Sequence, residues 1–213
     1  LMRGRDFPDF DTPMPIGRRV AVVGAGNTAM DATRVSLRLG SEKVYCVYRR
    51  TKAESPARAE EVHHAEEEGI EFHWLTSPIE ILDDGKGNVR GMRCIRMELG
   101  EPDESGRRGP VPIAGSEFEF EAETVVIAIG TNANPIIGQT SKLKLNRRGY
   151  IETDDNLATS MAGVYAGGDI VTGAATVIEA MGAGRKAARS MKAWLGIRDT
   201  EKVYLPEGAT GAG

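Results

Sequence analysis

A glycine-rich segment near the start of the chain has the residue types and spacing of a phosphate-binding turn. It follows the β-branched run at residues 20–23, and the stretch after it, residues 27–39, contains neither Gly nor Pro. Gly24 permits a tight turn, Gly26 lets a ligand approach the backbone, and a helix that begins there offers free amides at its positive end. We therefore expect an anionic ligand at this turn. The expected binding residues are Gly24, Gly26, Asn27, Thr28 and Ala29, the last being a small residue that permits close packing of helix on strand.

The context of the turn indicates a dinucleotide. A strand at 18–23, a helix that ends at Gly40 and a second strand at 43–48 form a βαβ unit of about 30 residues. A glycine pattern alone also occurs in ordinary turns. Its position after a strand and before a helix favours a dinucleotide-binding site.

Two arginines at the end of the second strand indicate which dinucleotide. Arg49 and Arg50 stand 23 and 24 residues after Gly26, where an acidic residue would accept a hydrogen bond from an unphosphorylated ribose. Arginines at this place accommodate a 2′-phosphate, so the sequence predicts NADPH rather than NADH, with Arg58 as a third phosphate contact. The alternative is that the arginines end a strand in solvent, as surface arginines commonly do.

The remaining pattern predicts an α/β protein, with a Rossmann-like parallel sheet and helices followed by a three-stranded β-meander. Residues 100–112 are polar and contain Gly and Pro, so we expect a loose surface loop there. Residues 1–17 are expected to be extended. The further expected elements are helices at 56–68 and 174–195, strands at 70–75, 124–129, 150–152 and 163–166, and meander strands at 80–82, 89–99 and 116–121.

Composition excludes several functions. Hydrophobic residues make up 40% and charged residues 27% of the 213 residues, as in folded globular proteins. The net charge of −4 argues against nucleic acid as a partner, and no apolar stretch reaches the roughly 20 residues that span a membrane. We expect a cytoplasmic protein whose two cysteines, Cys46 and Cys94, are buried thiols outside catalysis.

A helix with two histidines raises the question of a metal site. His63 and His64 lie near Glu60 and Glu67 at helical spacing. Each His-Glu pair supplies too few ligands for a metal, and such pairs are common on solvated helices. We expect no metal here.

Five stretches resemble the small (beta) subunit of NADPH-dependent glutamate synthase and its relatives in the pyridine nucleotide-disulfide oxidoreductase superfamily. In such proteins an NADPH domain is inserted into an FAD domain. The resemblance therefore implies a connecting segment from the FAD domain at 1–17, an NADPH-binding domain at 18–131 and the C-terminal part of the FAD-binding domain at 132–213. The stretches are 20–34 (VAVVGAGNTAMDATR), 45–50, 58–69 (RAEEVHHAEEEG), 124–130 and 163–188 (GVYAGGDIVTGAATVIEAMGAGRKAA).

The same resemblance implies a flavin contact in the second half of the chain. Asp169 would accept a hydrogen bond from the ribityl chain of FAD, and the helix after it would direct its positive end at the flavin. The family's first FAD motif and its cysteine-rich iron-sulfur segments are absent, so the chain resembles a C-terminal piece that alone binds FAD poorly and is inactive. The implied cofactor-binding residues are Gly130, Gly168, Asp169, Ala175, Thr176 and Val177.

The resemblance implies hydride transfer from NADPH to FAD and on to a further electron acceptor. Because cofactors carry that chemistry, no catalytic side chain is expected. The implied partner is a larger glutamate synthase subunit or an iron-sulfur protein, and a homodimer is possible; ferredoxin, polysulfide or a pyrimidine are other acceptors in such relatives. The alternative of another class is a non-catalytic module that binds NADPH or docks a subunit.

Overall fold

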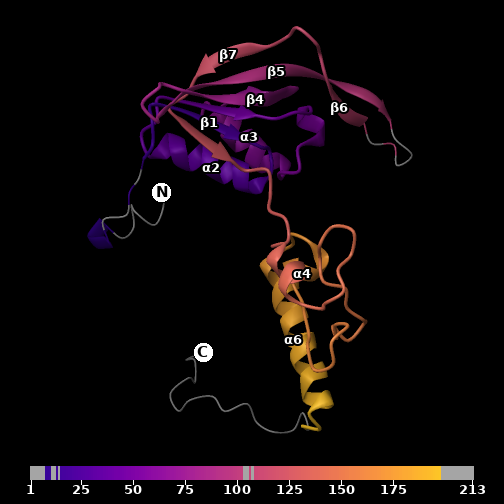
Figure 1. Ribbon diagram of the computed structural model, residues 1–213. Helices are drawn as coiled ribbons and strands as arrows, with labels where there is room; N and C mark the ends of the chain where they lie inside the picture. The colour runs from indigo at the N-terminus through magenta and orange to yellow at the C-terminus, as the bar shows by residue number, and fades with distance from the viewer. Residues whose placement is uncertain (1–7, 11–12, 14, 103–105, 107, 198–213) are drawn as a thin grey trace. The chain divides into compact units, whose positions relative to one another are not determined.

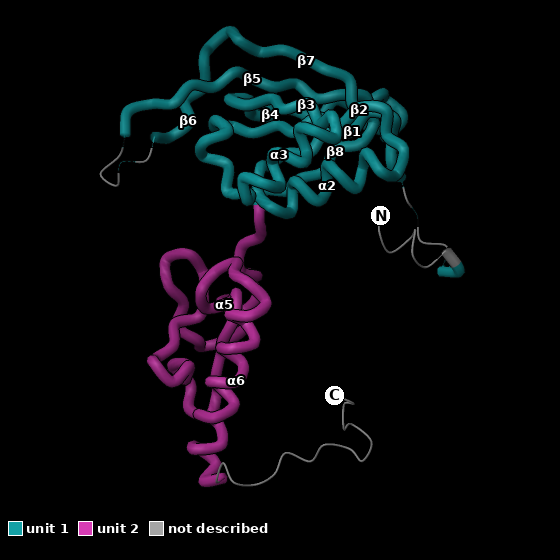
Figure 2. Tube along the Cα trace, turned by 180° about the vertical axis from the view of Figure 1, so that it is seen from behind, with its two compact units in different colours: residues 1–129 teal, residues 130–213 magenta. Residues whose placement is uncertain are grey.

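The computed structural model of the protein describes residues 8–10, 13, 15–102, 106 and 108–197 (Figure 1). The chain divides into two compact units, Leu1–Ile129 and Gly130–Gly213, called here unit 1 and unit 2 (Figure 2). No helix among the described residues is long and apolar enough to cross a membrane.

Unit 1 has three layers (Figure 1). Its middle layer is a four-stranded parallel sheet in the order β3-β2-β1-β8. Two helices cover one face, and antiparallel strands cover the other. The elements are β1 (Arg19–Val23), α2 (Asn27–Arg38), β2 (Lys43–Val47), η2 (Lys52–Glu54), α3 (Ala59–Glu67), β3 (Glu71–His73), β4 (Thr76–Asp83), β5 (Val89–Pro102), β6 (Arg108–Pro112), β7 (Phe118–Glu121) and β8 (Thr124–Ile127).

The alternation of side chains along the parallel strands builds two cores from one sheet. Val20 and Val22 of β1 are fully buried and pack with the helices. Ala21 and Val23 point to the other face and pack with Met92 of β5. Successive side chains on a strand point to opposite faces, so a continuous apolar run is what a strand covered on both faces requires. The predicted βαβ unit is confirmed, and so is the burial of the two cysteines.

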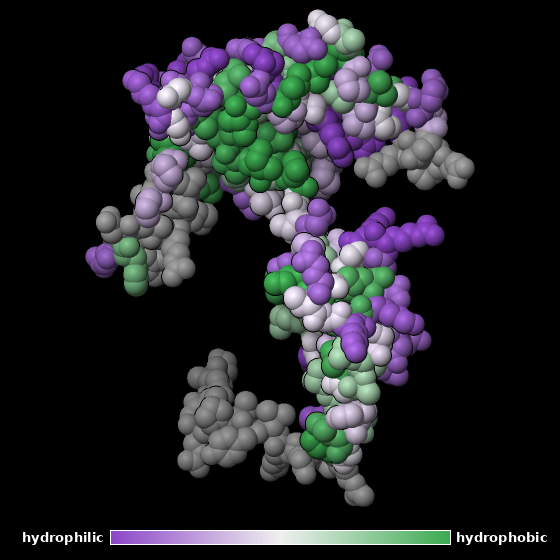
Figure 3. All heavy atoms as spheres, viewed as in Figure 1, coloured by the Kyte–Doolittle hydropathy of each residue, from purple (hydrophilic) through white to green (hydrophobic). Residues whose placement is uncertain are grey.

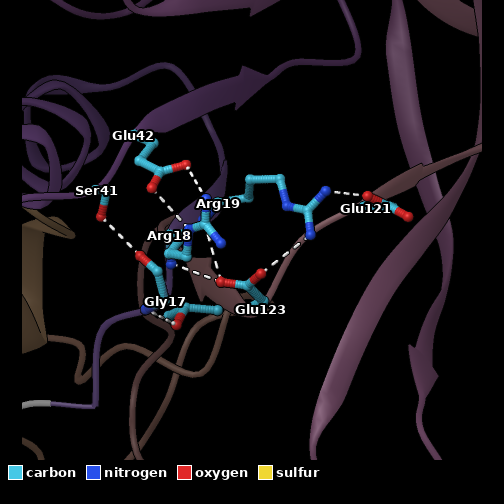
Figure 4. A network of polar contacts seen from close by, with 8 residues as sticks. Gly17, Arg18, Arg19, Ser41, Glu42, Glu121 and Glu123 are labelled. Atoms are coloured by element: carbon cyan, nitrogen blue, oxygen red, sulfur yellow. Dashed lines mark hydrogen bonds and ion pairs between the residues drawn. The ribbon is translucent and has the colours of Figure 1, made fainter.

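A polar network fixes the strand ends that lie opposite the glycine turn (Figure 4). The Arg18 guanidinium donates to both carboxylate oxygens of Glu42, at 2.7 and 2.8 Å. Arg19 pairs with Glu121 and with Glu123, the latter at 3.1 Å, and the hydrogen bond from Arg19 lowers the pKa of Glu123 below its ordinary value. Glu123 also accepts from the Arg18 amide at 2.6 Å. The network therefore joins the starts of β1, β2 and β8 and supports their register.

The prediction of a loose loop at 100–112 was wrong for residues 100–102 and 108–112, while residues 103–105 and 107 lie outside the described part of the chain. Strand β5 continues to Pro102, and β6 pairs with it from Arg108 to Pro112. Among the described strands, β6 pairs with β5 alone, so prolines can sit on β6 with the side that lacks an N–H turned away from the ladder. The meander is otherwise confirmed, because β5 pairs with β4 on one side and β7 on the other.

Unit 2 is less regular than expected. Its helices are α4 (Ile136–Thr140), α5 (Asp169–Thr172) and α6 (Val177–Trp194), and α6 confirms the predicted long helix. The strands predicted at 150–152 and 163–166 were wrong, because Ile151 and Tyr165 form only isolated bridges, with Leu145 and Ala158. An isolated bridge pairs one residue with one partner, whereas a strand needs several consecutive pairs.

Part of the N-terminal segment also differs from expectation. Pro8–Phe10 form the short 3₁₀-helix η1, whereas an extended segment was predicted for residues 1–17. Residues 1–7, 11–12 and 14 of that prediction lie outside the described part.

Candidate dinucleotide-binding site

The glycine turn after β1 is shaped by contacts that exclude a side chain at its first position. Gly24 has φ +127°, and its amide donates to the Val47 carbonyl at 2.9 Å. A Cβ at Gly24 would lie 2.2 Å from the Ala128 carbonyl oxygen. The Cys46 thiol donates to the Gly24 carbonyl at 3.2 Å. The turn is therefore held between β2 and the end of β8, and only glycine fits there.

The start of α2 presents amide groups without internal partners. Gly26 is the N-cap residue, with φ −85° and no side-chain cap, and the first helical bond runs from the Met30 amide to its carbonyl at 3.0 Å. The amides of Asn27, Thr28 and Ala29 precede that bond and have no acceptor within the helix. Asn27 and Thr28 are exposed, while Ala29 is fully buried against the core. This arrangement is suited to an anion.

The three arginines expected to contact a 2′-phosphate differ in their surroundings. Arg49 and Arg58 are exposed. Arg50 is only 7% exposed, and its Nη2 donates to the carbonyl of Arg108 at 2.9 Å. Its Nε is buried and has no partner in the described part of the chain. Two guanidinium groups are thus free to meet a ligand, and the third carries an unsatisfied donor.

Residues 55–58, the segment before α3, lie against the glycine turn. The Ser55 hydroxyl donates to the Ala25 carbonyl at 2.8 Å, and the Ala57 amide donates to the same carbonyl at 3.2 Å. The Arg58 amide donates to Oδ1 of Asn27 at 3.0 Å. Sequence reasoning missed Ser55 and the side-chain role of Asn27, because a hydrogen bond across 30 residues leaves no local pattern.

A pocket of about 340 Å³ in unit 2 brings together five of the six residues expected to contact a flavin, whereas Gly130 is not part of its lining. Gly168, with φ +78°, precedes Asp169, the first residue of α5. A second pocket of about 220 Å³ shares Asp169 and includes Thr131, the residue after Gly130. The first pocket is lined by Gly167, Gly168, Asp169, Ala175, Thr176, Val177, Ala180 and Gly184.

The N-terminus of α6 at this pocket is closed by a capping box. The Thr176 hydroxyl accepts from the Glu179 amide at 3.3 Å, and the Glu179 carboxylate accepts from the Thr176 amide at 2.9 Å. The bond from the Thr176 amide lowers the pKa of Glu179. A carboxylate therefore offsets part of the positive end of the helix. Val177 and Ile178 follow it with side chains 75% and 81% exposed.

The buried thiols have no features of redox or nucleophilic groups. Burial raises the pKa of Cys46 to about 12 and that of Cys94 to about 11, so neither forms a thiolate near neutral pH.

His63 contacts Glu67 at 3.3 Å on α3. Among the described residues, no group of three or more His, Cys, Asp or Glu side chains could hold a metal.

The chain is similar to several curated proteins. It is 49% identical to the NADP(+)-dependent formate dehydrogenase subunit beta of Moorella thermoacetica, over 90% of this chain and 27% of that protein. It is 39% identical to the NADPH-Fe(3+) oxidoreductase subunit beta of Geobacter sulfurreducens, over 92% and 32% respectively. It is 40% identical to the small chain of NADPH glutamate synthase of Escherichia coli, over 85% of this chain and 39% of that protein. The chain spans about a quarter to two fifths of the length of these three relatives.

Solved structures share the fold. The thioredoxin reductase of T. acidophilum matches with a TM-score of 0.65 and 28% identity, over 82% of this chain and 52% of that one. FprA from Mycobacterium tuberculosis in complex with NADPH matches with a TM-score of 0.67 and 20% identity, over 84% of this chain and 53% of that one. The family model for pyridine nucleotide-disulphide oxidoreductases matches residues 6–184. The resemblance seen in the sequence is confirmed, and the chain belongs to the pyridine nucleotide-disulphide oxidoreductase family.

Proposed function

We propose that unit 1 is the NADPH-binding domain of a flavin-dependent oxidoreductase. The observation that carries the proposal is the start of α2, where uncapped amides follow a turn that has no side chain at Gly26. A Cβ at Gly26 would have only one neighbour within 4 Å, Pro56 at 3.8 Å, so a ligand can approach the backbone there. The amides of Asn27 and Thr28 would hold the pyrophosphate.

The arginines after β2 support NADPH over NADH. Arg49 and Arg58 are exposed, so we assign them to the 2′-phosphate. The Nη2 of Arg50 donates to the Arg108 carbonyl on β6, and its buried Nε has no partner among the described residues. We assign Arg50 to the same site, where an anion would compensate its buried charge.

Unit 2 is proposed to be the C-terminal part of an FAD-binding domain. Asp169 lines both pockets, and its carboxylate would accept hydrogen bonds from a ribityl chain. The Val177 and Ile178 amides follow the Thr176 cap and would face the flavin together with Ala175. Gly130 is assigned to the cofactor contacts as the positive-φ residue at the start of unit 2.

When bound, the two cofactors would supply the redox chemistry, that is, hydride donation by NADPH and acceptance by FAD. The residues of this chain bind and orient, and the proposal requires none of them to act as acid or base. The three curated relatives are named as subunits or chains of larger enzymes, which supports the proposal that a partner subunit or an iron-sulfur protein receives the electrons.

Exposed apolar surface supports the involvement of further polypeptide. Figure 3 shows apolar side chains gathered over β8 on the visible face of unit 1. Ile127, the last residue of β8, is 55% exposed, and Ile129, two residues after it in the chain, is 73% exposed. On α6 of unit 2, Met181 is 64% exposed beside Val177 and Ile178. Contiguous apolar surface is typical of sites that another polypeptide covers.

The test is calorimetric titration of the intact protein with NADPH and with NADH. We expect tighter binding of NADPH, and we expect the Arg49→Ala, Arg58→Ala variant to lose at least about tenfold in NADPH affinity while NADH affinity changes little, because charge-assisted hydrogen bonds are lost. Arg90→Ala is the matched control, since Arg90 bonds the Asp83 carbonyl away from the turn. Equal binding of both nucleotides, or none, would contradict the proposal.

A further inference from the structure

The 55–58 segment is held at both of its ends. Before it, the Thr51 hydroxyl and amide bond the Glu54 carboxylate at 2.6 and 3.0 Å, and the Tyr48 hydroxyl donates to the Glu54 carbonyl at 2.9 Å. These contacts close η2. The 55–58 segment then meets the glycine turn through the hydroxyl of Ser55 and the side chain of Asn27.

Asn27 makes a contact that its position does not require. As the first residue of α2, it contributes an amide to the start of the helix, and the helix has no side-chain cap. Its side-chain oxygen instead accepts from the Arg58 amide at 3.0 Å. Arg58 is the N-cap residue of α3, so this bond fixes where the chain turns into that helix.

We propose that Asn27 and Ser55 are positioning residues that set the preference for a 2′-phosphorylated nucleotide. They join the turn assigned to the pyrophosphate to the segment that carries Arg58. The inference rests on the proposed function, because it takes Arg58 as a contact of the 2′-phosphate.

The physical basis is preorganisation. The ligand has two anionic groups, and the proposal assigns the pyrophosphate to the glycine turn and the 2′-phosphate to the 55–58 segment. These two segments are 30 residues apart in the chain, counted from Ala25 to Ser55. If the segments were free to move, ordering them would consume part of the binding free energy of the second group. The Asn27 and Ser55 bonds provide that order before the ligand arrives, so their loss would weaken the 2′-phosphate contact more than the pyrophosphate contact.

The experiment measures NADPH and NADH affinities of the intact protein carrying Asn27→Ala or Ser55→Ala. For each variant we expect NADPH affinity to fall about three- to tenfold, the usual effect of one hydrogen bond, and NADH affinity to change less than about twofold. In an Arg58→Ala background, Asn27→Ala should have little further effect, because the group that it positions is gone. Asn88→Ala is the matched control, since it removes a side-chain bond to Asp84 in the turn between β4 and β5.

Two results would overturn the inference while the proposed function stands. One is an equal loss of NADPH and NADH affinity in Asn27→Ala, which would mean that the Asn27 side chain, and not only its backbone amide, serves the pyrophosphate. The other is full additivity of Asn27→Ala with Arg58→Ala. A wild-type protein that binds neither nucleotide would instead remove the proposed function and this inference with it. Ser55→Ala removes a different side-chain bond to the same segment. If one of the two variants fails to fold, the nucleotide affinities of the other still decide the question.

Discussion

Two glycines of one turn should respond in opposite ways to the same substitution. At Gly24 an added Cβ would lie 2.2 Å from the Ala128 carbonyl oxygen, and φ is +127°. At Gly26 the nearest atom to an added Cβ is Cγ of Pro56 at 3.8 Å, and φ is −85°. We predict that Gly24→Ala destabilises the fold and that Gly26→Ala mainly removes NADPH binding.

The magnitudes follow from those distances. A contact of 2.2 Å with backbone forces β1 and the end of β8 apart, and overpacking of this kind costs about 1–3 kcal/mol. The unfavourable φ adds about 1–2 kcal/mol, so the unfolding free energy should fall by about 2–5 kcal/mol. At roughly 2–4 °C per kcal/mol for a chain of 213 residues, that lowers Tm by about 4–20 °C. Gly26→Ala makes only an ordinary contact and should change the unfolding free energy by less than about 1 kcal/mol.

Binding shows the reverse order. A methyl group at Gly26 would stand between the backbone and the pyrophosphate, so NADPH affinity should fall by more than about tenfold. Thermal unfolding and calorimetric titration of both variants, made in the intact protein, provide the two measurements. The reasoning is refuted if Gly26→Ala binds NADPH as the wild type does, or if Gly24→Ala melts within about 2 °C of it.

Two further predictions concern helix packing and the pocket of unit 2. Arg34→Ala should lower the unfolding free energy by about 1 kcal/mol at pH 7, because the Arg34 guanidinium bonds Glu68 at 2.9 and 3.0 Å between α2 and α3. The bond from Arg34 lowers the pKa of Glu68 below its ordinary 4.5, so this stability is present above pH 4.5 and is lost as the pH falls through the pKa of Glu68 in the folded protein. Denaturation at several pH values should show that the difference in unfolding free energy between wild type and Arg34→Ala narrows in acid. A difference that stays constant with pH would contradict the assignment. Asp169→Asn should reduce the flavin content of the purified intact protein and leave the Tm of the flavin-free protein unchanged, because the exposed Asp169 side chain has no bonded partner among the described residues. Flavin absorbance measures the flavin content. Full retention of flavin would contradict the assignment of this pocket to FAD.

The parts of unit 1 that could be predicted are those that local pattern determines. Residues 20–23 are all apolar, a pattern that indicates a strand covered on both faces of its sheet. The structure confirms it, because a hydrophobic core lies on each face of the parallel sheet. The glycine spacing placed the turn and the start of α2 correctly. In unit 2, Thr176 and Glu179 form a capping box at α6 that the sequence analysis did not predict, although the pattern lies within four residues of sequence.

The parts that failed depend on pairing across the chain. Strand β6 contains Pro110 and Pro112, which locally indicate a loop, and only its pairing with β5 makes it a strand. Conversely, Ile151 and Tyr165 lie in apolar stretches that indicate strands, but each finds a single bridge. A strand is a property of two segments, so a reading of one segment at a time errs in both directions.

The arginine pair shows the same limit at the candidate site. Arg49 and Arg50 are adjacent and chemically identical, yet one is exposed and the other donates to the Arg108 carbonyl on β6. Adjacent residues after a strand point in different directions, so one of the pair turns to the solvent and the other toward the antiparallel strands. The type of residue indicated the ligand chemistry, whereas the role of each arginine depends on a strand that the sequence did not reveal.

The comparisons also separate what this chain determines from what it does not. Relatives named for formate dehydrogenase, for Fe(3+) reduction and for glutamate synthase all align over 85–92% of this chain, yet the alignments cover only 27–39% of those proteins. Different names on one shared segment mean that the segment carries a property they have in common. NADP or NADPH occurs in all three names, and the turn, the amides of α2 and the exposed arginines are suited to that nucleotide. The three names agree in the nucleotide and differ in the rest of the enzyme, which supports the proposal that unit 1 binds NADPH.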